Sequence, residues 1–249
     1  FNCYHFRIII SHMSNREHLF DFVAGEMILI DKPLNWTSFD VVNLIRSFIR
    51  RQYGLKKLKV GHAGTLDPLA TGLLIICTGK LTKTIDEYQG MDKTYVGSMK
   101  MGCTTPSFDG ETEPDAHFDI SHLTDDELVE TSKNFLGNID QVPPIYSAIK
   151  IAGKRAFEHA RKKENVALKS RSVNIHQFDL YHIDLPNIDF SVTCSKGTYI
   201  RSLINDFGKS LNNGAYLTQL RRTAIGKYTV SDAYTLDEFK QKVLEQTDI

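Results

Sequence analysis

The sequence predicts an α+β fold built on a mixed, largely antiparallel sheet flanked by helices. Strand-like and helix-like segments follow one another without the regular rhythm that builds a parallel sheet of β-α-β units. Two long runs, over residues 173–185 and 188–195, alternate polar and apolar side chains with a period of two, as where Cys194 stands between Thr193 and Ser195. Such alternation is typical of strands with one buried face.

The N-terminal part of the chain supplies short elements in alternation. A β-branched strand over 26–30 precedes a helix that Thr37 or Ser38 caps and that Gly54 ends. Apolar residues of this helix recur at i, i+4, i+7 and i+8, which places its arginines away from the apolar face. The elements expected next are a strand over 73–77, a short helix over 81–89 and a strand over 93–101.

The rest of the chain continues this mixture. An acidic loop is expected over 103–119, and Thr124 begins a capping box for a helix over 125–135. Pro143 and Pro144 form a rigid, extended connector. The remaining expected elements are a strand over 147–151, a basic helix over 155–162, the two long strands, and helices over 199–211 and 236–245.

Length and composition are those of an ordinary globular chain. Its 249 residues are 41% hydrophobic and 24% charged, enough for one large domain or two small ones. No repeat or linker marks a boundary, so we expect a single domain over 21–249, preceded by an atypical aromatic and apolar segment over 1–20. A run of about 18 apolar residues is absent, so no membrane span is predicted.

The four cysteines lie at long and uneven spacings without a C-x-x-C pair. This pattern disfavours both a zinc ribbon and a disulfide framework. The histidines are scattered without metal-ligand spacing, so no metal is expected. A reduced, cytoplasmic protein is the simplest interpretation.

The net charge of zero hides a polarised chain. Residues 46–59 carry six basic residues and no acid, residues 150–171 carry eight basic residues and two acids, and residues 101–132 carry nine acids and no Lys or Arg. Basic segments that converge on one face would form a surface that follows nucleic-acid phosphates, although ordinary solvated helix faces explain the charges equally well. The candidate phosphate contacts are Arg46, Arg50, Lys59, Lys150, Lys154 and Arg155.

The most unusual segment is 61–72, which contains three glycines, a proline and two threonines and predicts an irregular loop. Asp67 precedes Pro68, which favours an extended backbone and a fixed direction for the carboxylate. A rigid carboxylate in a glycine-rich loop is a candidate catalytic group. From spacing alone, an Asx-turn in which Asp67 only satisfies the backbone is the stronger alternative.

Several cofactor motifs are missing. The chain has no G-x-G-x-x-G after a strand and no G-x-x-x-x-G-K-[ST], which disfavours dinucleotide and P-loop binding. It also lacks H-E-x-x-H and the paired H-x-E and P-C-x-x-C motifs of zinc deaminases. We therefore expect no cofactor.

The string Gly-His-Ala-Gly-Thr-Leu-Asp-Pro-Leu-Ala-Thr-Gly-Leu-Leu over 61–74 resembles the nucleophile motif of the TruB family of pseudouridine synthases. Further strings resemble other motifs of that family and occur in the family's order over 26–230. They are Asp31-Lys32-Pro33 with Thr37-Ser38, Lys93-Thr94-Tyr95, residues 141–150 with 153–156, residues 194–201, and Leu220-Arg221-Arg222.

The resemblance implies a pseudouridine synthase fold and the isomerisation of a uridine in the T-loop of tRNA, position 55 in tRNA numbering. The reaction breaks N1–C1′, rotates the base and joins C5 to C1′, so it needs no cofactor. In this interpretation Asp67 is the nucleophile, and Arg201 lies beside it to keep it charged. The base must be flipped out of the folded RNA to reach Asp67.

The resemblance also implies roles for neighbouring residues. His62 would fill the space that the flipped base leaves, and Tyr95 would stack on that base or take the C5 proton. Tyr199 and Leu220 would form the pocket wall, although simple packing is an alternative for both. The residues expected to support the Asp67 loop are Lys32, Pro33, Gly61, Gly64 and Thr65.

The sequence departs from the family pattern in three places. Asn35 and Trp36 replace a glycine-containing turn, and residues 103–110 are a shortened threonine-rich loop that we expect to alter RNA contacts without touching the chemistry. The chain also stops about 20 residues after Tyr228, where many relatives carry a PUA RNA-binding domain. We therefore expect a monomer without that domain, which binds the T-loop and T-stem of tRNA through its own basic segments.

Other functions remain open at this point. One is a non-catalytic RNA binder, such as a tRNA-folding chaperone that uses the same basic groove; the combination of Asp67, Tyr95 and Arg201 argues against it. Another is the catalytic subunit of a guide-RNA-directed particle. A metabolic enzyme with a metal site in the acidic residues 109–130 is the most distant alternative, because those carboxylates have no fixed ligand spacing.

Overall fold

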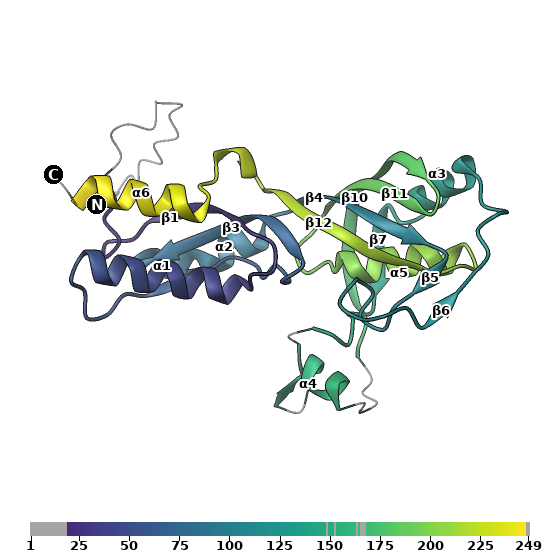
Figure 1. Cartoon of the computed structure of the whole chain (residues 1–249), viewed down its shortest axis with the longest axis horizontal. Coiled ribbons are helices and arrows are strands. Elements are labelled where there is room, and N and C mark those ends of the chain that lie inside the picture. The colour runs from purple at the N-terminus through teal and green to yellow at the C-terminus, as the bar shows by residue number, and fades with distance from the viewer. Residues whose placement is uncertain (1–18, 148, 152, 163, 165–167, 248–249) are drawn as a thin grey trace, which may run out of the picture.

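The computed structural model describes residues 19–147, 149–151, 153–162, 164 and 168–247 (Figure 1). Within them, one nine-stranded sheet has the order β1-β3-β12-β4-β11-β10-β7, with β2 paired to β3 and β13 to β12. Its strands are β1 (Met27–Lys32), β2 (Val60–His62), β3 (Ala70–Thr78), β4 (Lys93–Met101), β7 (Gly137–Gln141), β10 (Arg171–Asp184), β11 (Asn187–Cys194), β12 (Ala215–Ile225) and β13 (Tyr228–Thr229).

Helices cover this sheet at its two ends, and the chain also contains 3-10 helices and small hairpins. The α-helices are α1 (Ser38–Gln52), α2 (Ile85–Gly90), α3 (Asp125–Lys133), α4 (Ala156–Arg161), α5 (Ile200–Ser210) and α6 (Leu236–Thr247). Two 3-10 helices are η1 (Gly79–Thr84) and η2 (Val230–Asp232). Two small hairpins pair β5 (Cys103–Thr104) with β6 (Ala116–His117) and β8 (Lys150–Ile151) with β9 (Lys154–Arg155).

The sheet confirms the predicted α+β class with a mixed, largely antiparallel sheet. Neighbouring strands in it run antiparallel except β3 and β12, which pair in parallel from Leu220 opposite Ala70 to Arg222 opposite Gly72. The sequence did not predict β12, although it lies at the centre between β3 and β4. Polar side chains interrupt its apolar alternation because one of its faces lines a cleft rather than a core.

The molecule has separate cores at its two ends (Figure 1). At one end, α1 and α6 pack on β1 and β3, with Ile45 and Phe239 fully buried between them. At the other end, α3 and α5 pack on β10 and β11 around Phe190 and Phe207. The strands β4 and β12 pass from one end to the other, so the middle of the sheet is the place where a cleft forms.

The predicted start of α1 is confirmed in detail. Thr37 is the N-cap residue: its hydroxyl accepts a hydrogen bond from the Asp40 amide, and the Asp40 side chain accepts one from the Thr37 amide. This reciprocal arrangement satisfies two amides that a helix end otherwise leaves without partners. Directly after the cap, the Ser38 hydroxyl exchanges hydrogen bonds with the backbone of Leu66, so the cap also holds the loop that contains Asp67.

Several predicted boundaries were wrong. The irregular segment at 61–72 is shorter, because β2 extends through His62 and β3 begins at Ala70. The expected acidic loop at 103–119 contains the β5–β6 hairpin, and the expected strand at 147–151 is reduced to β8. The strand β7 was missed, because Gly137, Asn138 and Asp140 give it a polar sequence at the sheet edge. Short edge elements depend on their pairing partners more than on their own propensity.

Residue 20, which the sequence placed in the atypical segment, belongs to a core. The Phe20 ring stacks on Phe22 with centroids 5.0 Å apart and packs against Phe239 of α6. Residues 1–18 lie outside the described part of the chain.

Gly72 allows β3 and β12 to approach, and we expect Gly72→Ala to destabilise the protein by about 2–4 kcal/mol. Its φ is +102°, and a Cβ there would lie 2.3 Å from the Arg222 carbonyl oxygen. Gly54 has a φ of +60° with no atom within 4 Å of its Cβ position, so Gly54→Ala measures the backbone strain alone. Urea unfolding of both variants tests this: equal losses of free energy would contradict the steric argument.

Candidate active site

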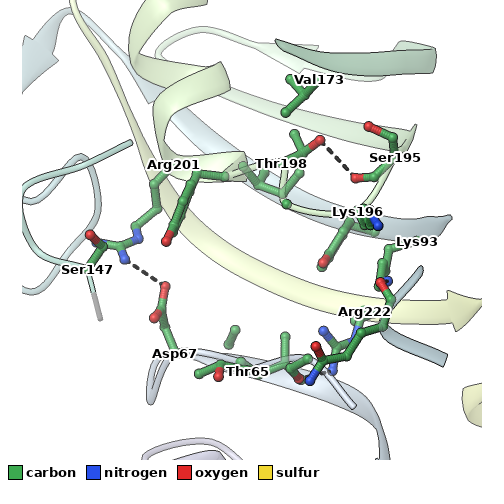
Figure 2. Close-up of a pocket in the computed structure, with 18 of the residues that line it drawn as sticks. Thr65, Asp67, Lys93, Ser147, Val173, Ser195, Lys196, Thr198, Arg201 and Arg222 are labelled. Atoms are coloured by element: carbon green, nitrogen blue, oxygen red, sulfur yellow. Dashed lines mark hydrogen bonds and ion pairs between the residues drawn. The ribbon is translucent and has the colours of Figure 1, made fainter. Parts of the chain in front are cut away.

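A cleft of about 830 Å³ lies over the middle of the sheet, between the loop that joins β2 to β3 and the turn that enters α5. Figure 2 shows Asp67 and Thr65 on one side of it, facing Arg201 and Thr198 on the other, while Arg222 lies farther along the cleft. The cleft therefore combines segments that are far apart in the sequence, and the parallel pairing of β3 with β12 holds them together.

Asp67 and Arg201 form an ion pair across this cleft. The Oδ2 atom of Asp67 lies 2.9 Å from Nη2 of Arg201 (Figure 2). The Arg201 side chain is only 4% exposed, whereas that of Asp67 is 43% exposed. The carboxylate is thus held by a buried cation but remains open to the cleft, so a ligand that fills the cleft would have to exclude water from it. An ionised carboxylate in this position can attack an electrophilic carbon or stabilise a cationic one.

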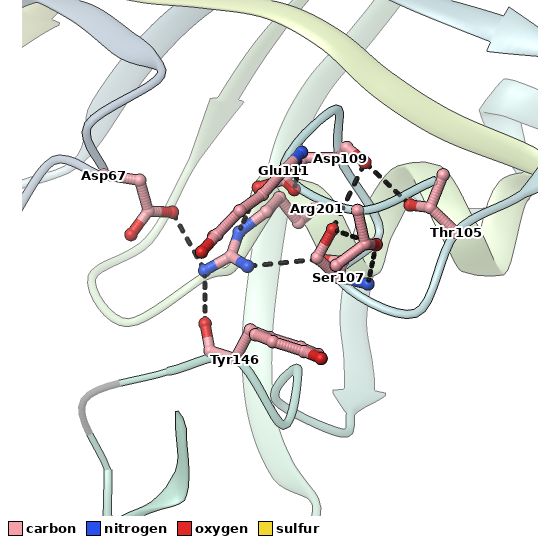
Figure 3. A network of polar contacts seen from close by, with 8 residues as sticks. Asp67, Thr105, Ser107, Asp109, Glu111, Tyr146 and Arg201 are labelled. Atoms are coloured by element: carbon pink, nitrogen blue, oxygen red, sulfur yellow. Dashed lines mark hydrogen bonds and ion pairs between the residues drawn. The ribbon is translucent and has the colours of Figure 1, made fainter. Parts of the chain in front are cut away.

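Arg201 is held by four groups from three segments of the chain (Figure 3). Its Nη1 donates to the Ser107 carbonyl at 3.1 Å and its Nη2 to the Tyr146 carbonyl at 2.8 Å. Its Nε lies 3.5 Å from Oδ2 of the buried Asp109, in addition to the pair with Asp67. A guanidinium with a fixed fork of donors suits this bridging position better than an ammonium.

The expectation that residues 103–110 stay away from the chemistry was wrong. Ser107 and Asp109 belong to that loop, and both contact Arg201. The Phe108 carbonyl also accepts a hydrogen bond from Leu217 of β12, which attaches the loop to the central sheet. This contact could not be predicted from the sequence, because composition does not distinguish a buried aspartate in a loop from an exposed one.

Backbone contacts fix the loop that carries Asp67. The buried Lys32 ammonium donates to the carbonyls of Pro33 at 2.9 Å, Trp36 at 2.6 Å and Pro68 at 3.5 Å. Burial lowers the Lys32 pKa to about 8. The Asn35 amide, in the turn that departs from the family pattern, donates to the Pro68 carbonyl at 2.8 Å. The structure therefore brings Lys32 and its neighbours beneath the Asp67 loop.

The other residues expected to support the loop differ in their positions. Gly61 lies in β2, where a Cβ would approach Ile85 to 2.7 Å. Gly64 has a φ of +93°, and its carbonyl accepts a hydrogen bond from Arg222. Thr65 is exposed and lines the cleft.

The expected base-contacting residues Tyr95, Tyr199 and Leu220 all line the cleft. Tyr95 of β4 is 8% exposed, and its burial raises the pKa of its hydroxyl. Tyr199 is the N-cap residue of α5, and the Arg171 guanidinium lies over its ring at 4.4 Å from the centroid. Leu220 is on β12 opposite Ala70. Aromatic and apolar surfaces are thus next to the carboxylate, as a base-binding pocket requires.

His62 does not line this cleft. It is half-buried at the end of β2, paired with Ile76 of β3. Burial, with a smaller effect of Arg222, lowers the pKa of the imidazole, so the ring is neutral at pH 7. Its Nδ1 atom is buried without a hydrogen-bond partner among the described residues. To enter an RNA stack, the side chain would have to move from this position.

Basic side chains that sequence reasoning did not assign to the site also line the cleft. They are Lys93, Arg171, Lys196 and Arg222. Lys93 is buried, donates to the carbonyls of Gln89 and Met91, and has its pKa lowered to about 8 by desolvation. Lys93, Lys196 and Arg222 lie inside strings that resemble family motifs, so the resemblance could have identified them as residues of the site. Arg171 lies outside those strings. Together these cations make the cleft positively charged, and a positive cleft attracts a phosphate backbone.

The candidate phosphate contacts lie elsewhere. Arg46 and Arg50 are on α1, where Arg46 bonds to Asn43, and Lys59 precedes β2. Lys154 is exposed in β9. The side chains of Lys150 and Arg155 fall outside the described part of the structure. Arg46, Arg50, Lys59 and Lys154 do not line the cleft, so any RNA contact they make is outside it.

The described residues show neither a metal site nor a membrane-spanning helix. No group of three or more His, Cys, Asp or Glu side chains in this part of the chain could hold a metal ion. Of the helices described, none has the length and apolar character needed to cross a membrane.

Solved structures share this fold. The crystal structure of a Cbf5-Nop10-Gar1 complex aligns with a TM-score of 0.65 and 25% identity, over 91% of this chain and 60% of that chain. A structure of an H/ACA RNP bound to a substrate RNA containing 2′-deoxyuridine aligns with a TM-score of 0.64 and 25% identity, over 92% of this chain and 56% of that one. The fold is that of the pseudouridine synthases, which are isomerases.

Family models identify the branch of that class. The model of the TruB family pseudouridylate synthase N-terminal domain matches residues 50–200, and that of the tRNA pseudouridylate synthase B C-terminal domain matches residues 201–248. The chain belongs to the TruB family of pseudouridylate synthases. The two matched segments meet inside α5, a continuous helix whose second residue is Arg201.

Curated relatives agree with this assignment. A protein of Flavobacterium johnsoniae named tRNA pseudouridine synthase B is 54% identical over 90% of this chain and 98% of its own length. A protein of Phocaeicola vulgatus with the same name is 50% identical over 91% of this chain and 96% of its own length.

Proposed function

We propose that this enzyme isomerises the uridine at position 55, in the T-loop of tRNA, to pseudouridine. The observation that carries the proposal is the ion pair between Asp67 and the buried Arg201 in a basic cleft. The relatives at about 50% identity carry the name of a tRNA-modifying enzyme over nearly their whole length, which supports tRNA as the substrate. The reaction conserves all atoms of the RNA and has no redox step, so side chains alone can catalyse it.

In this proposal Asp67 acts on C1′ of the target nucleotide, and the ion pair with Arg201 holds the carboxylate in position. The base must leave the T-loop stack, at a cost of a few kcal/mol. Tyr95 stacks on it, at about 1–3 kcal/mol, which offsets part of that cost. Tyr199 and Leu220 close the pocket, and His62 turns out of its half-buried position to fill the gap in the RNA.

We also infer a monomeric enzyme in the cytoplasm. The cleft residues described above all come from one chain, so no second copy is needed to complete it. Cys77, Cys103 and Cys194 are buried and free, which fits a reducing compartment that contains tRNA.

Mapping of the modification tests the substrate. A tRNA transcript and an isolated T-stem-loop are incubated with the enzyme, and pseudouridine is located by carbodiimide treatment and primer extension. We expect one modified position, at uridine 55, in both RNAs, and none when that uridine is replaced by cytidine. Modification elsewhere would contradict the assigned position, and tRNA refolding without pseudouridine would favour the RNA chaperone.

Salt dependence tests whether α1 follows the RNA backbone away from the cleft. Ser38, at the start of α1, bonds to the Asp67 loop, so the helix begins at the site and its residues Arg46 and Arg50 lie progressively farther from it. We expect the double variant Arg46→Gln and Arg50→Gln to lower the slope of log Kd against log salt by about 1.5. Lys133→Gln on α3 is the control, because Lys133 pairs with Glu130 at the other end of the molecule. An unchanged slope would remove α1 from the RNA-binding surface.

A further inference from the structure

Arg222 is a buried cation to which the proposed function gives no individual role. It lies on β12 and is 1% exposed, the largest of the fully buried side chains in the described residues. Its Nε donates to the Leu73 carbonyl at 2.8 Å and its Nη2 to the Gly64 carbonyl at 3.0 Å. Among the described residues, no carboxylate lies within ion-pair distance of it.

The preceding residue shows what an ordinary arginine does in this strand. Arg221 points to the opposite face of the sheet and forms a bidentate pair with Asp31, at 3.0 and 2.6 Å. Arg222 has only neutral carbonyls as hydrogen-bond acceptors, although burying a charge without a counter-charge is strongly unfavourable. A neutral amide could donate to the same carbonyls. The charge itself therefore needs a reason, and an anion that forms only during the reaction is one.

Tyr95 lies near Arg222 and can become an anion during the reaction, because its phenol can lose a proton. In the antiparallel pairing of β12 with β4, Arg222 lies directly opposite Tyr95, so the two side chains extend from the same face of the sheet, and both line the cleft. Burial disfavours the phenolate, whereas the guanidinium favours it. Hydrogen bonds to Gly64, in the loop that carries Asp67, and to Leu73 in β3 hold the guanidinium on the face of the sheet that Tyr95 shares.

Isomerisation must move a proton from C5 to N1 of the uracil, because in the product C5 carries the sugar and N1 carries hydrogen. When N1–C1′ breaks, the bonding electrons remain on the base, and the Tyr95 hydroxyl can give its proton to N1 and become a phenolate. After C5 bonds to C1′, the phenolate can take the proton from C5. The electrons of the C5–H bond then return to the ring, and Tyr95 is a phenol again.

We propose that Arg222 is a positioning residue that stabilises the Tyr95 phenolate during this proton transfer. The proposal rests on the proposed function and adds to it a residue that does not touch the RNA. It assigns Tyr95 the proton transfer in addition to base stacking, and it explains why a charged side chain occupies a buried position beneath the Asp67 loop.

Other charged or titratable groups surround this pair, and their effects must be separated. Five of them, each from a different segment, are close enough to act on Arg222 or Tyr95: Lys32 of β1, His62 of β2, Asp67 of the loop, Lys93 of β4 and Cys194 of β11. The pKa values of Lys32 and Lys93 are about 8, so both lose charge in mildly alkaline solution. A pH profile alone would also report the titration of these lysines, so a measurement specific to the C5–H bond is needed as well.

Single-turnover rates on a T-stem-loop RNA, with uridine or 5-deuterouridine at the target position, provide that readout. We expect Arg222→Gln to slow isomerisation by about 10²-fold, the effect of weakening a general base, with little change in RNA affinity. Breaking C5–H should become slower than the other steps, so the deuterium isotope effect should increase. The pH above which the rate falls should also increase, because Tyr95 must begin as a phenol and loss of the guanidinium raises the pKa of that phenol. Arg222→Lys, which keeps the charge, should stay within about 10-fold of the wild type.

A double-variant cycle and a neighbouring control decide the outcome. In a Tyr95→Phe background, Arg222→Gln should cause no further loss of rate, because the two residues act through one group. Arg221→Gln, next to it on the other face, should leave both rate and isotope effect unchanged. Additive losses, or an unchanged isotope effect in Arg222→Gln, would overturn the proposal.

Two further results remain informative. If urea unfolding shows that Arg222→Gln does not fold, Arg222→Lys becomes the test. A folded Arg222→Lys whose isomerisation rate falls by more than 10-fold would overturn the charge argument. A near wild-type rate with a wild-type isotope effect would support it. Absence of pseudouridine with the wild-type enzyme would instead overturn the proposed function itself.

Discussion

We expect Asp67→Asn to lower the single-turnover rate of pseudouridine formation on the order of 10⁴-fold or more, the scale seen when a group that reacts with substrate is removed. Asparagine has nearly the same shape but carries no charge to attack or stabilise C1′. The loop should keep its conformation, because its contacts with Lys32, Ser38 and Asn35 involve backbone atoms of Leu66 and Pro68 rather than the carboxylate. RNA affinity should therefore be retained.

The second aspartate–arginine pair of the protein supplies the control. Asp31 pairs with Arg221 at 2.6 Å on the opposite face of the sheet, so Asp31→Asn removes an ion-paired carboxylate outside the cleft. This variant should keep a rate close to that of the wild type. Rates, RNA affinity and urea midpoints are measured for both. A catalytically competent Asp67→Asn, or an equal loss in Asp31→Asn, would refute the role of Asp67 as the reacting carboxylate.

The second large effect concerns Arg201. We expect Arg201→Met to abolish activity and to lower the free energy of unfolding by about 3–5 kcal/mol, because it leaves Asp109 buried without its cation. Arg201→Lys keeps the charge but loses the fork that reaches Asp67, Ser107 and Tyr146 together. Its rate should fall by about 10²–10³-fold with a smaller loss of stability.

Arg221→Lys at the Asp31 pair is the matched control, since it makes the same chemical change in a bidentate pair that faces away from the cleft. Unfolding free energies and single-turnover rates are compared across the three variants. Arg201→Lys with wild-type rate would show that a point charge suffices and that the fork geometry has no catalytic consequence. Arg201→Met with wild-type stability would show that Asp109 does not depend on Arg201.

Local signals predicted most of the elements. The cap at Thr37, the apolar face of α1 and the alternation in β10 and β11 are patterns within a few residues, and each produced the structure expected from it. Elements with mixed or polar sequences, such as β7 and β12, were missed, because pairing with neighbouring strands stabilises them. In β12, Leu220 and Arg222 face the cleft while Arg221 faces the other side, so the strand never shows a plain apolar alternation.

The site residues likewise divide into those that the motifs predicted and those that only the structure revealed. The motif strings located Asp67, Tyr95 and Arg201, and the structure brings all three to one cleft. It does not bring His62 there, since that side chain is half-buried against β3. It adds Asp109 and Arg222, whose importance depends on burial and on partners that are distant in the chain.

Short strings and local periodicity were enough to predict the family, the candidate carboxylate and the α+β class. Three features became visible only in the folded molecule: Asp67 is half-exposed while its arginine is buried, the 103–110 loop contacts Arg201, and a central strand places Arg222 opposite Tyr95. Burial and ion pairing depend on contacts between residues far apart in the chain, and local patterns do not encode such contacts.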